Sequence, residues 1–182
     1  MSLPPNKNLL AEYPNRYFVE TGSYRGDAIQ LALEAGFTDI RSIDIDPENT
    51  KFCKYRFDLI PRIDQVMHPI KLYTGDSAFQ LWDMIKDIPE PITFWLDSHS
   101  QLFEDEPVLG EDFPLLWELL QITKHPVKTH AILIDDILMM THPDVTGWCR
   151  KDIEDKLLLI NPAYKFQYVA NPVKNNLLIA TV

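Results

Sequence analysis

The chain has 182 residues, of which 46% are hydrophobic and 11% aromatic. This is enough for one sizeable core, so we expect a single domain over residues 1–182. The formal net charge of −10 argues against a nucleic-acid partner, because affinity for a phosphate backbone depends on lysine and arginine contacts.

The cysteines and the apolar runs indicate the compartment. Cys53 and Cys149 fall within expected helices and lack the spacing of metal ligands, which is typical of reduced thiols in a cytosolic protein. Residues 1–8 lack the long apolar run of a signal peptide. No stretch of about 18 apolar residues is available for a membrane span. We therefore expect a cytoplasmic protein with no membrane partner.

The N-terminal quarter of the chain predicts a strand, a tight glycine turn and a helix. Residues 1–15 form an extended or short helical lead-in. A short apolar run predicts a strand at 17–21, Gly22 and Gly26 follow, and an amphipathic pattern predicts a helix at 27–35. Glycine has no Cβ, so this loop would let a ligand approach the main chain and the N–H groups of the helix start.

The same alternation continues along the chain. Further strands are predicted at 40–45, 69–73, 92–96 and 131–134, and further helices at 46–58, 78–86, 114–124 and 144–160. The chain closes with strands at 165–170 and 176–181, and their short linker makes them antiparallel neighbours.

This order of elements predicts the fold class. We expect an α/β, Rossmann-like, doubly wound and mostly parallel seven-stranded sheet with a C-terminal antiparallel hairpin and helices on both faces. The acidic, irregular stretch 98–113 is interpreted as an active-site lid, with a solvated surface loop as the alternative.

Acidic residues follow the predicted strands. Ligands of such sheets bind at the carboxyl ends of the strands, near the switch in strand order. A sheet needs no carboxylates there for its structure, although any one of them can be a helix cap. The acidic residues at these positions are Glu20, Asp44, Asp76, Asp97, Asp135 and Asp136.

Three segments together resemble the nucleotide half of the class I S-adenosylmethionine-dependent methyltransferases. They are Glu20-Thr21-Gly22-Ser23-Tyr24-Arg25-Gly26, Ser42-Ile43-Asp44-Ile45-Asp46-Pro47 and Gly75-Asp76-Ser77. The resemblance in element order covers nearly the whole chain. The missing G-x-G-x-x-G pattern counts against a nicotinamide or flavin dehydrogenase.

The resemblance implies how S-adenosylmethionine would be bound. Glu20, Gly22 and Gly26 would hold its methionine end, Asp44 would pair with the ribose diol, and Asp76 would receive the adenine amino group. A carboxylate can accept two hydroxyls, and acidic surroundings suit a sulfonium cation. The cofactor-binding candidates are Glu20, Thr21, Gly22, Ser23, Gly26, Asp44, Ile45, Asp76, Ser77 and Asp97.

Two segments in the second half resemble metal-dependent O-methyltransferases, such as the catechol, caffeoyl-coenzyme A and macrolide-sugar enzymes. They are Phe94-Trp95-Leu96-Asp97-Ser98-His99 and Ile132-Leu133-Ile134-Asp135-Asp136. The resemblance implies that Asp97, Asp135 and Asp136 bind Mg²⁺ or Ca²⁺, cations that prefer oxygen ligands. Such a metal would lower the pKa of a substrate hydroxyl. In the alternative interpretation, Asp135 or Asp136 only caps the following turn.

His99 is the candidate general base, because the ordinary pKa of histidine lies near neutrality. Asp97, two residues earlier, is the second candidate catalytic residue. The catechol-type enzymes have a lysine just beyond the metal aspartate, and Ser100 stands there in this chain. A lysine base is therefore not available.

These observations predict a methyltransferase that acts on oxygen. The absence of a basic substrate patch favours a small hydroxylated metabolite or sugar as acceptor, and a homodimer is a possible assembly. Two other functions stay open. One is a cofactor-binding or regulatory module without turnover, and the other is a metal-dependent enzyme of different chemistry that uses Asp97, Asp135 and Asp136.

Overall fold

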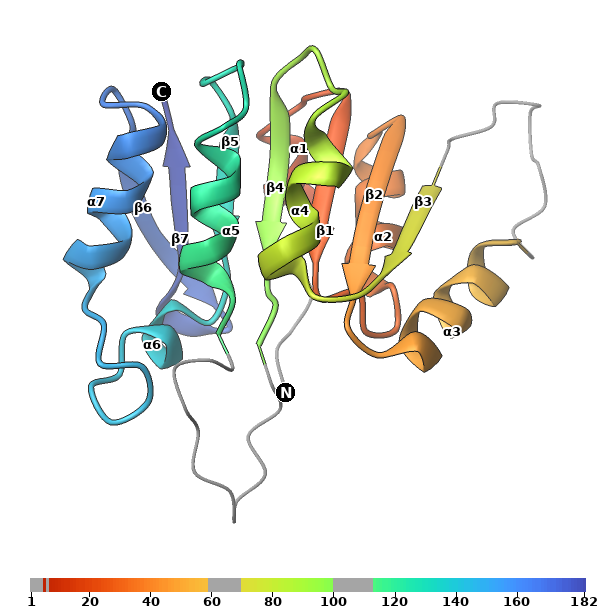
Figure 1. Ribbon diagram of the computed structural model, residues 1–182. Helices are drawn as coiled ribbons and strands as arrows, with labels where there is room; N and C mark the ends of the chain where they lie inside the picture. Colours follow the sequence, from red (N-terminus) through yellow and green to blue (C-terminus); the bar gives the residue numbers. More distant parts are fainter. Residues whose placement is uncertain (1–4, 6, 59–69, 100–112) are drawn as a thin grey trace.

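A seven-stranded sheet forms the centre of the structure, a computed structural model that describes residues 5, 7–58, 70–99 and 113–182. The strand order is β3-β2-β1-β4-β5-β7-β6 (Figure 1). Strands β1 to β5 are parallel, and β7 runs antiparallel to both β5 and β6. The predicted fold class is confirmed. The strands are β1 (Tyr17–Thr21), β2 (Asp39–Asp44), β3 (Ile70–Thr74), β4 (Ile92–Leu96), β5 (Ala131–Ile134), β6 (Lys165–Asn171) and β7 (Val173–Thr181).

Helices cover both faces of the sheet. In the view of Figure 1, α4, α5 and α7 lie in front of it, and α1, α2 and α3 cover the opposite face. None of the described helices is both long and apolar enough to cross a membrane. The helices are α1 (Lys7–Ala11), α2 (Asp27–Ala35), α3 (Pro47–Asp58), α4 (Ser77–Ile85), α5 (Leu115–Ile122), α6 (Ile137–Met140) and α7 (Arg150–Ile160).

The central strands are buried on both sides, which explains their nearly continuous apolar sequences. Successive side chains of a strand point to opposite faces. In β1, Val19 packs with the core under α4, α5 and α7, whereas Phe18 packs with the core under α1 and α2. Ile132 and Leu133 of β5 divide between the two cores in the same way.

Three details differ from the sequence predictions. The helix predicted at 144–160 begins only at Arg150, because residues 141–149 form turns in which the Thr146 hydroxyl donates to the Met140 carbonyl. The short α6 was not predicted. Only Pro172 separates β6 from β7, so the hairpin is tighter than expected. Most of the lid predicted at 98–113 lies outside the described residues.

The strand order brings the carboxyl ends of β1, β2, β4 and β5 to one edge of the sheet, the lower edge in Figure 1. From β1 the chain first moves outward through β2 and β3 and then returns to β4 on the other side of β1. The switch in strand order therefore lies between β1 and β4. Glu20 and Asp97 lie at this switch, and the other candidate residues lie beside it at the ends of the neighbouring strands.

Candidate functional site

The glycine loop after β1 packs directly against the end of β4. Gly22 has a φ of +88°, and a Cβ at this position would lie 2.6 Å from the backbone oxygen of Asp97. Its N–H donates to the carbonyl of Ile43 at the end of β2. Gly26, with a φ of +76°, is the N-cap of α2, and a Cβ there would lie 2.7 Å from the ring of Phe57. Both positions require glycine for backbone conformation and for space.

Glu20 is a buried carboxyl group at the end of β1. It accepts a hydrogen bond from the Ser42 hydroxyl, and the hydroxyl oxygens of Ser42 and Ser23 lie 2.6 Å apart. Burial raises the pKa of Glu20 well above its ordinary value, the bond from Ser42 partly opposes this rise, and the negative charge of Asp97 adds to it. A bound cationic group would offset the cost of ionising Glu20 here.

Asp44 at the end of β2 organises the neighbouring loop. One carboxylate oxygen accepts the Tyr24 N–H at 2.7 Å, and the other accepts the Asp46 N–H at 2.9 Å and the Asn49 amide at 3.2 Å. The next residue, Ile45, exposes 73% of its surface. The carboxylate of Asp44 and the exposed apolar side chain of Ile45 are therefore adjacent in sequence at the carboxyl end of β2.

Asp76 and Ser77 lie where β3 leads into α4. Asp76 caps α4, because its carboxylate accepts the Ala78 N–H at 2.8 Å, so the capping alternative raised for these carboxylates holds at this position. The N–H of Gly75 donates to the Asp44 carbonyl at 2.9 Å, which joins the ends of β3 and β2. The Asp76 carboxylate has two oxygens, so capping and ligand binding are compatible.

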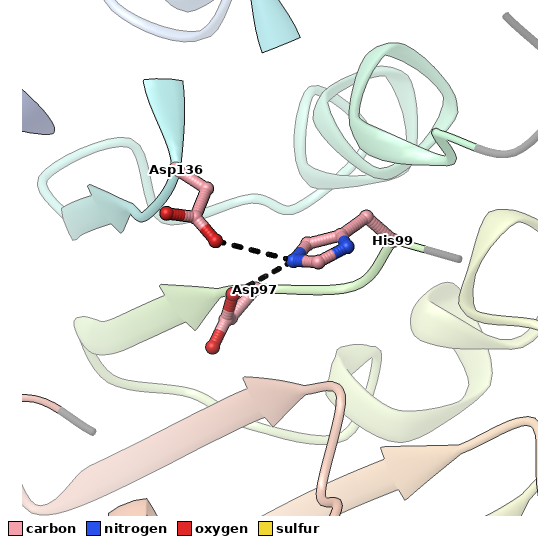
Figure 2. Close-up of side chains that lie close together, drawn as sticks. All are labelled: Asp97, His99 and Asp136. Atoms are coloured by element: carbon pink, nitrogen blue, oxygen red, sulfur yellow. Dashed lines mark hydrogen bonds and ion pairs between the residues drawn. The ribbon is translucent and has the colours of Figure 1, made fainter. Parts of the chain in front are cut away.

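A second group lies at the ends of β4 and β5. Asp97, His99 and Asp136 each offer one ligand atom, and these three atoms lie within 4.8 Å of one another. Figure 2 shows that both carboxylates face the same imidazole nitrogen, Nε2 of His99. This nitrogen lies 3.2 Å from Asp136 Oδ2 and 3.7 Å from Asp97 Oδ1. The ring of His99 stacks on Phe113, with the ring centroids 6.2 Å apart.

Asp136, rather than Asp135, points to this group. Asp136 has a φ of +50°, in the left-handed region, and its other oxygen accepts the Asn176 amide at 2.7 Å. Burial tends to raise the pKa of Asp136, but hydrogen bonds from His99 and Asn176 outweigh it and lower that pKa. Asp135 is fully buried and accepts the Asn171 amide at 2.9 Å. Among the described residues, His99 therefore takes the place in the cluster that was predicted for Asp135.

Sequence reasoning missed Ser42 and Asn176, which donate hydrogen bonds to Glu20 and Asp136, and the buried Glu118, which accepts a hydrogen bond from Ser77. Ser42 lies inside a predicted strand, and Asn176 begins the strand predicted at 176–181, so their positions in sequence gave no sign of a polar contact. Glu118 did carry a signal, because it is the one acidic residue in the mostly apolar run Leu115–Ile122. An acidic residue on the inner face of a helix needs a partner.

Comparison with protein-family models finds no match, and comparison with curated proteins finds none either. Solved structures match the fold at low sequence identity. The O-methyltransferase from Bacillus cereus, solved with S-adenosylhomocysteine (SAH), is 12% identical and has a TM-score of 0.68 over 97% of this chain and 78% of that chain. The O-methyltransferase TomG from Streptomyces achromogenes, involved in tomaymycin synthesis and solved with S-adenosylmethionine (SAM), is 14% identical, with a TM-score of 0.61 over 97% of this chain and 77% of that chain.

The matches also include a candidate rRNA methylase from Clostridium thermocellum, which is 11% identical and has a TM-score of 0.58 over 98% of this chain and 97% of that chain. Identities this low establish the fold and leave the acceptor open. The chain has the fold of the class I SAM-dependent methyltransferases.

Proposed function

We propose that the chain is a SAM-dependent methyltransferase that acts on an oxygen atom of a small hydroxylated metabolite or sugar. The observation that carries the proposal is the arrangement at one sheet edge: the Gly22 loop packs against Asp97, with Glu20 behind it and Asp44 beside it. When bound, SAM supplies a methyl group activated by the sulfonium. The chain's part is then to bind and orient donor and acceptor, which supplies much of the rate of a direct transfer.

Each residue at the strand ends would bind a different part of SAM. The buried Glu20 favours a cationic group nearby, and the methionine end of SAM carries a sulfonium and an ammonium group. Asp44 would accept the ribose hydroxyls, the exposed side chain of Ile45 offers an apolar surface for adenine, and Asp76 would receive the adenine amino group. Thr21, Gly22, Ser23, Gly26 and Ser77 complete the proposed donor site.

The cluster of Asp97, His99 and Asp136 fits a divalent cation, because two carboxylates and an imidazole converge on one point. A bound cation supplies Lewis acidity that lowers the pKa of an acceptor hydroxyl. Because the ligands include a nitrogen as well as oxygens, the expected metal changes from Mg²⁺ or Ca²⁺, which prefer oxygen, to Mn²⁺ or Zn²⁺. Because Nε2 of His99 faces both carboxylates, we assign His99 as a ligand rather than as the general base.

The acceptor is proposed from charge and from the kinds of enzyme that share the fold. A net charge of −10 disfavours RNA and other polyanions, because binding them would require basic contacts. The O-methyltransferases from Bacillus cereus and Streptomyces achromogenes share the fold and support oxygen as the acceptor atom.

The donor assignment is tested by comparing Asp44→Ala with Asp46→Ala. Hydrogen bonds to a charged group contribute about 1.5–3 kcal/mol, so Asp44→Ala should weaken SAH binding roughly ten- to hundredfold. Asp46 is exposed, and its carboxylate accepts the Glu48 N–H at the start of α3. Asp46→Ala should therefore change helix stability and leave SAH affinity intact. Titration calorimetry measures both. Equal affinities for the two variants would contradict the assignment.

The metal assignment is tested with Asp136→Asn and a panel of divalent cations. We expect wild-type protein to bind Mn²⁺ or Zn²⁺ more tightly than Mg²⁺, and Asp136→Asn to lose at least about tenfold in affinity, because it removes a charged ligand. Asp144→Asn is the control, since the Asp144 side chain is 93% exposed and lies outside the cluster. Unchanged metal binding by Asp136→Asn would refute the ligand set, and methyl transfer in excess chelator would refute metal assistance.

A further inference from the structure

Glu118 is a buried carboxyl group that the proposed chemistry does not use. It lies on α5, is 1% exposed, and accepts a hydrogen bond from the Ser77 hydroxyl at 2.5 Å. Ser77 is the first residue of α4 and is itself buried. A buried acid is costly unless it is hydrogen-bonded, so the placement of Glu118 depends on the start of α4.

A second polar residue of α5 holds the same turn of α4. The Gln121 amide donates to the carbonyls of Ser77 and Ala78, and its oxygen accepts the Trp82 N–H at 2.6 Å. Glu118 and Gln121 lie three residues apart and therefore on the same side of α5. Together they fix the first turn of α4, which Asp76 caps.

Ser77 connects this contact to the end of β4. Its hydroxyl also lies 3.4 Å from the Ser98 hydroxyl, and Ser98 follows Asp97. A hydroxyl has only one proton to donate. When Glu118 is ionised, Ser77 donates to it; when Glu118 is protonated, its own proton can go to Ser77, and the Ser77 proton can turn towards Ser98.

The charge of Glu118 changes close to neutral pH. Burial raises its pKa to about 7, the hydrogen bond from Ser77 and the hydroxyl of Thr21 oppose the rise, and the Asp76 carboxylate adds to it. Asp76 is the charged side chain that acts on Glu118 within the described part of the chain. Both forms of Glu118 are therefore populated under ordinary assay conditions.

We propose that Glu118 is a positioning residue for the methyl donor: through Ser77 it holds the turn that presents Asp76 to the adenine ring. The inference rests on the proposed donor site. It adds Glu118, which lies outside that site on α5, the helix that follows Asp97 and His99 in the chain. Ionised Glu118 is the stronger acceptor for the hydrogen bond from the Ser77 hydroxyl and so holds this turn more firmly than the protonated acid does. SAM affinity should therefore rise as the pH increases through 7.

The test compares Glu118→Gln and Glu118→Ala with the control Glu154→Gln. Glu154 also accepts a hydroxyl hydrogen bond, from Tyr168 at 2.7 Å, but lies on α7. SAM affinity is measured calorimetrically between about pH 6 and pH 8, on either side of the Glu118 pKa. We expect Glu118→Ala to bind SAM at least about tenfold more weakly and Glu154→Gln to bind like wild type. Glu118→Gln should bind like wild type near pH 6 and more weakly near pH 8.

The ratio of wild-type to Glu118→Gln affinity isolates Glu118, because other titrating groups are common to both proteins. A ratio that stays flat across this pH range would overturn the proposal, as would wild-type affinity in Glu118→Ala. If Glu118→Ala does not fold, the pH dependence of the ratio of wild-type to Glu118→Gln affinity still tests the proposal. Wild-type protein that binds no SAM refutes the donor site itself, so the two failures are distinguishable.

Discussion

Gly22 is the residue at which the backbone and the proposed donor site are most tightly coupled. Gly22 and Gly36 both have positive φ, at +88° and +96°, so alanine is strained at either position. A Cβ at Gly36 would meet nothing within 4 Å, whereas one at Gly22 would collide with the Asp97 carbonyl. Comparing alanine substitutions at Gly22 and Gly36 therefore distinguishes the effect of backbone strain from the effect of the contact between the loop and β4.

We predict that Gly36→Ala costs about 1–2 kcal/mol of unfolding free energy, the usual cost of a left-handed non-glycine residue, and leaves SAH affinity unchanged. Gly22→Ala should cost more and should also abolish SAH binding, because the loop must move away from Asp97. Urea unfolding and calorimetry measure the two quantities. Wild-type SAH affinity in Gly22→Ala would show that the packing of this loop is not needed for the donor.

For individual residues, the sequence predicted where a site residue lies in the fold better than it predicted where its side chain points. Glu20, Asp44 and Asp97 could be placed at the sheet edge because each stands at or just after the carboxyl end of a predicted strand. Which of Asp135 and Asp136 faces the cluster could not be predicted, because it depends on the left-handed backbone of Asp136 and on its contact with Asn176. His99 was predicted to be functional, but its position opposite both carboxylates comes from tertiary structure.

Among the elements, the C-terminal hairpin supports the proposed metal site. The Asn176 amide on β7 donates to Asp136 and to the Asn171 carbonyl, and the Asn176 oxygen accepts the Leu138 N–H of α6 at 3.3 Å. Asn171 of β6 donates to Asp135. The hairpin thus holds both aspartates that follow β5 and fixes the Asp136 carboxylate facing His99.

We predict that Asn176→Ala weakens metal binding roughly 10- to 100-fold without removing a ligand, the usual effect of losing a supporting hydrogen bond. It should also raise the pKa of Asp136, since the bond from Asn176 lowers it. Metal titration and an NMR titration of Asp136 measure the two effects, with Lys174→Ala, an exposed change on the same strand, as control. An unchanged Asp136 pKa would remove Asn176 from this role.

Element prediction succeeded where the periodic signal was long. The strands and helices of the first half were placed to within one or two residues, because glycine and Pro47 mark their ends. The four residues of α6 are too few to show a helical period. The start of α7 was predicted too early because the apolar pattern continues through Val145 and Trp148, which pack on the core from turns.

For the whole molecule, strand order is what assembles the site. Placing β1 between β2 and β4 brings Glu20, Asp44 and Asp97 to one edge although Glu20 and Asp97 are 77 positions apart in the sequence. The alternation of strands and helices predicted a doubly wound, mostly parallel sheet, and right-handed crossovers leave few topologies of this kind. The acceptor could not be predicted, because enzymes that share the fold act on different substrates. The net charge of −10 argues only against polyanions.

The most direct test of the central claim is a calorimetric titration of the wild-type chain with SAH, repeated with SAM and with adenosine alone. We predict saturable binding of about one SAH or SAM per chain, with weaker binding of adenosine, because it lacks the methionine end that Glu20 would attract. At about 100-fold excess over Kd this binding adds about 2.7 kcal/mol to stability and raises Tm by roughly 5–11 °C. Absence of both heat and thermal shift at millimolar SAH would contradict the account.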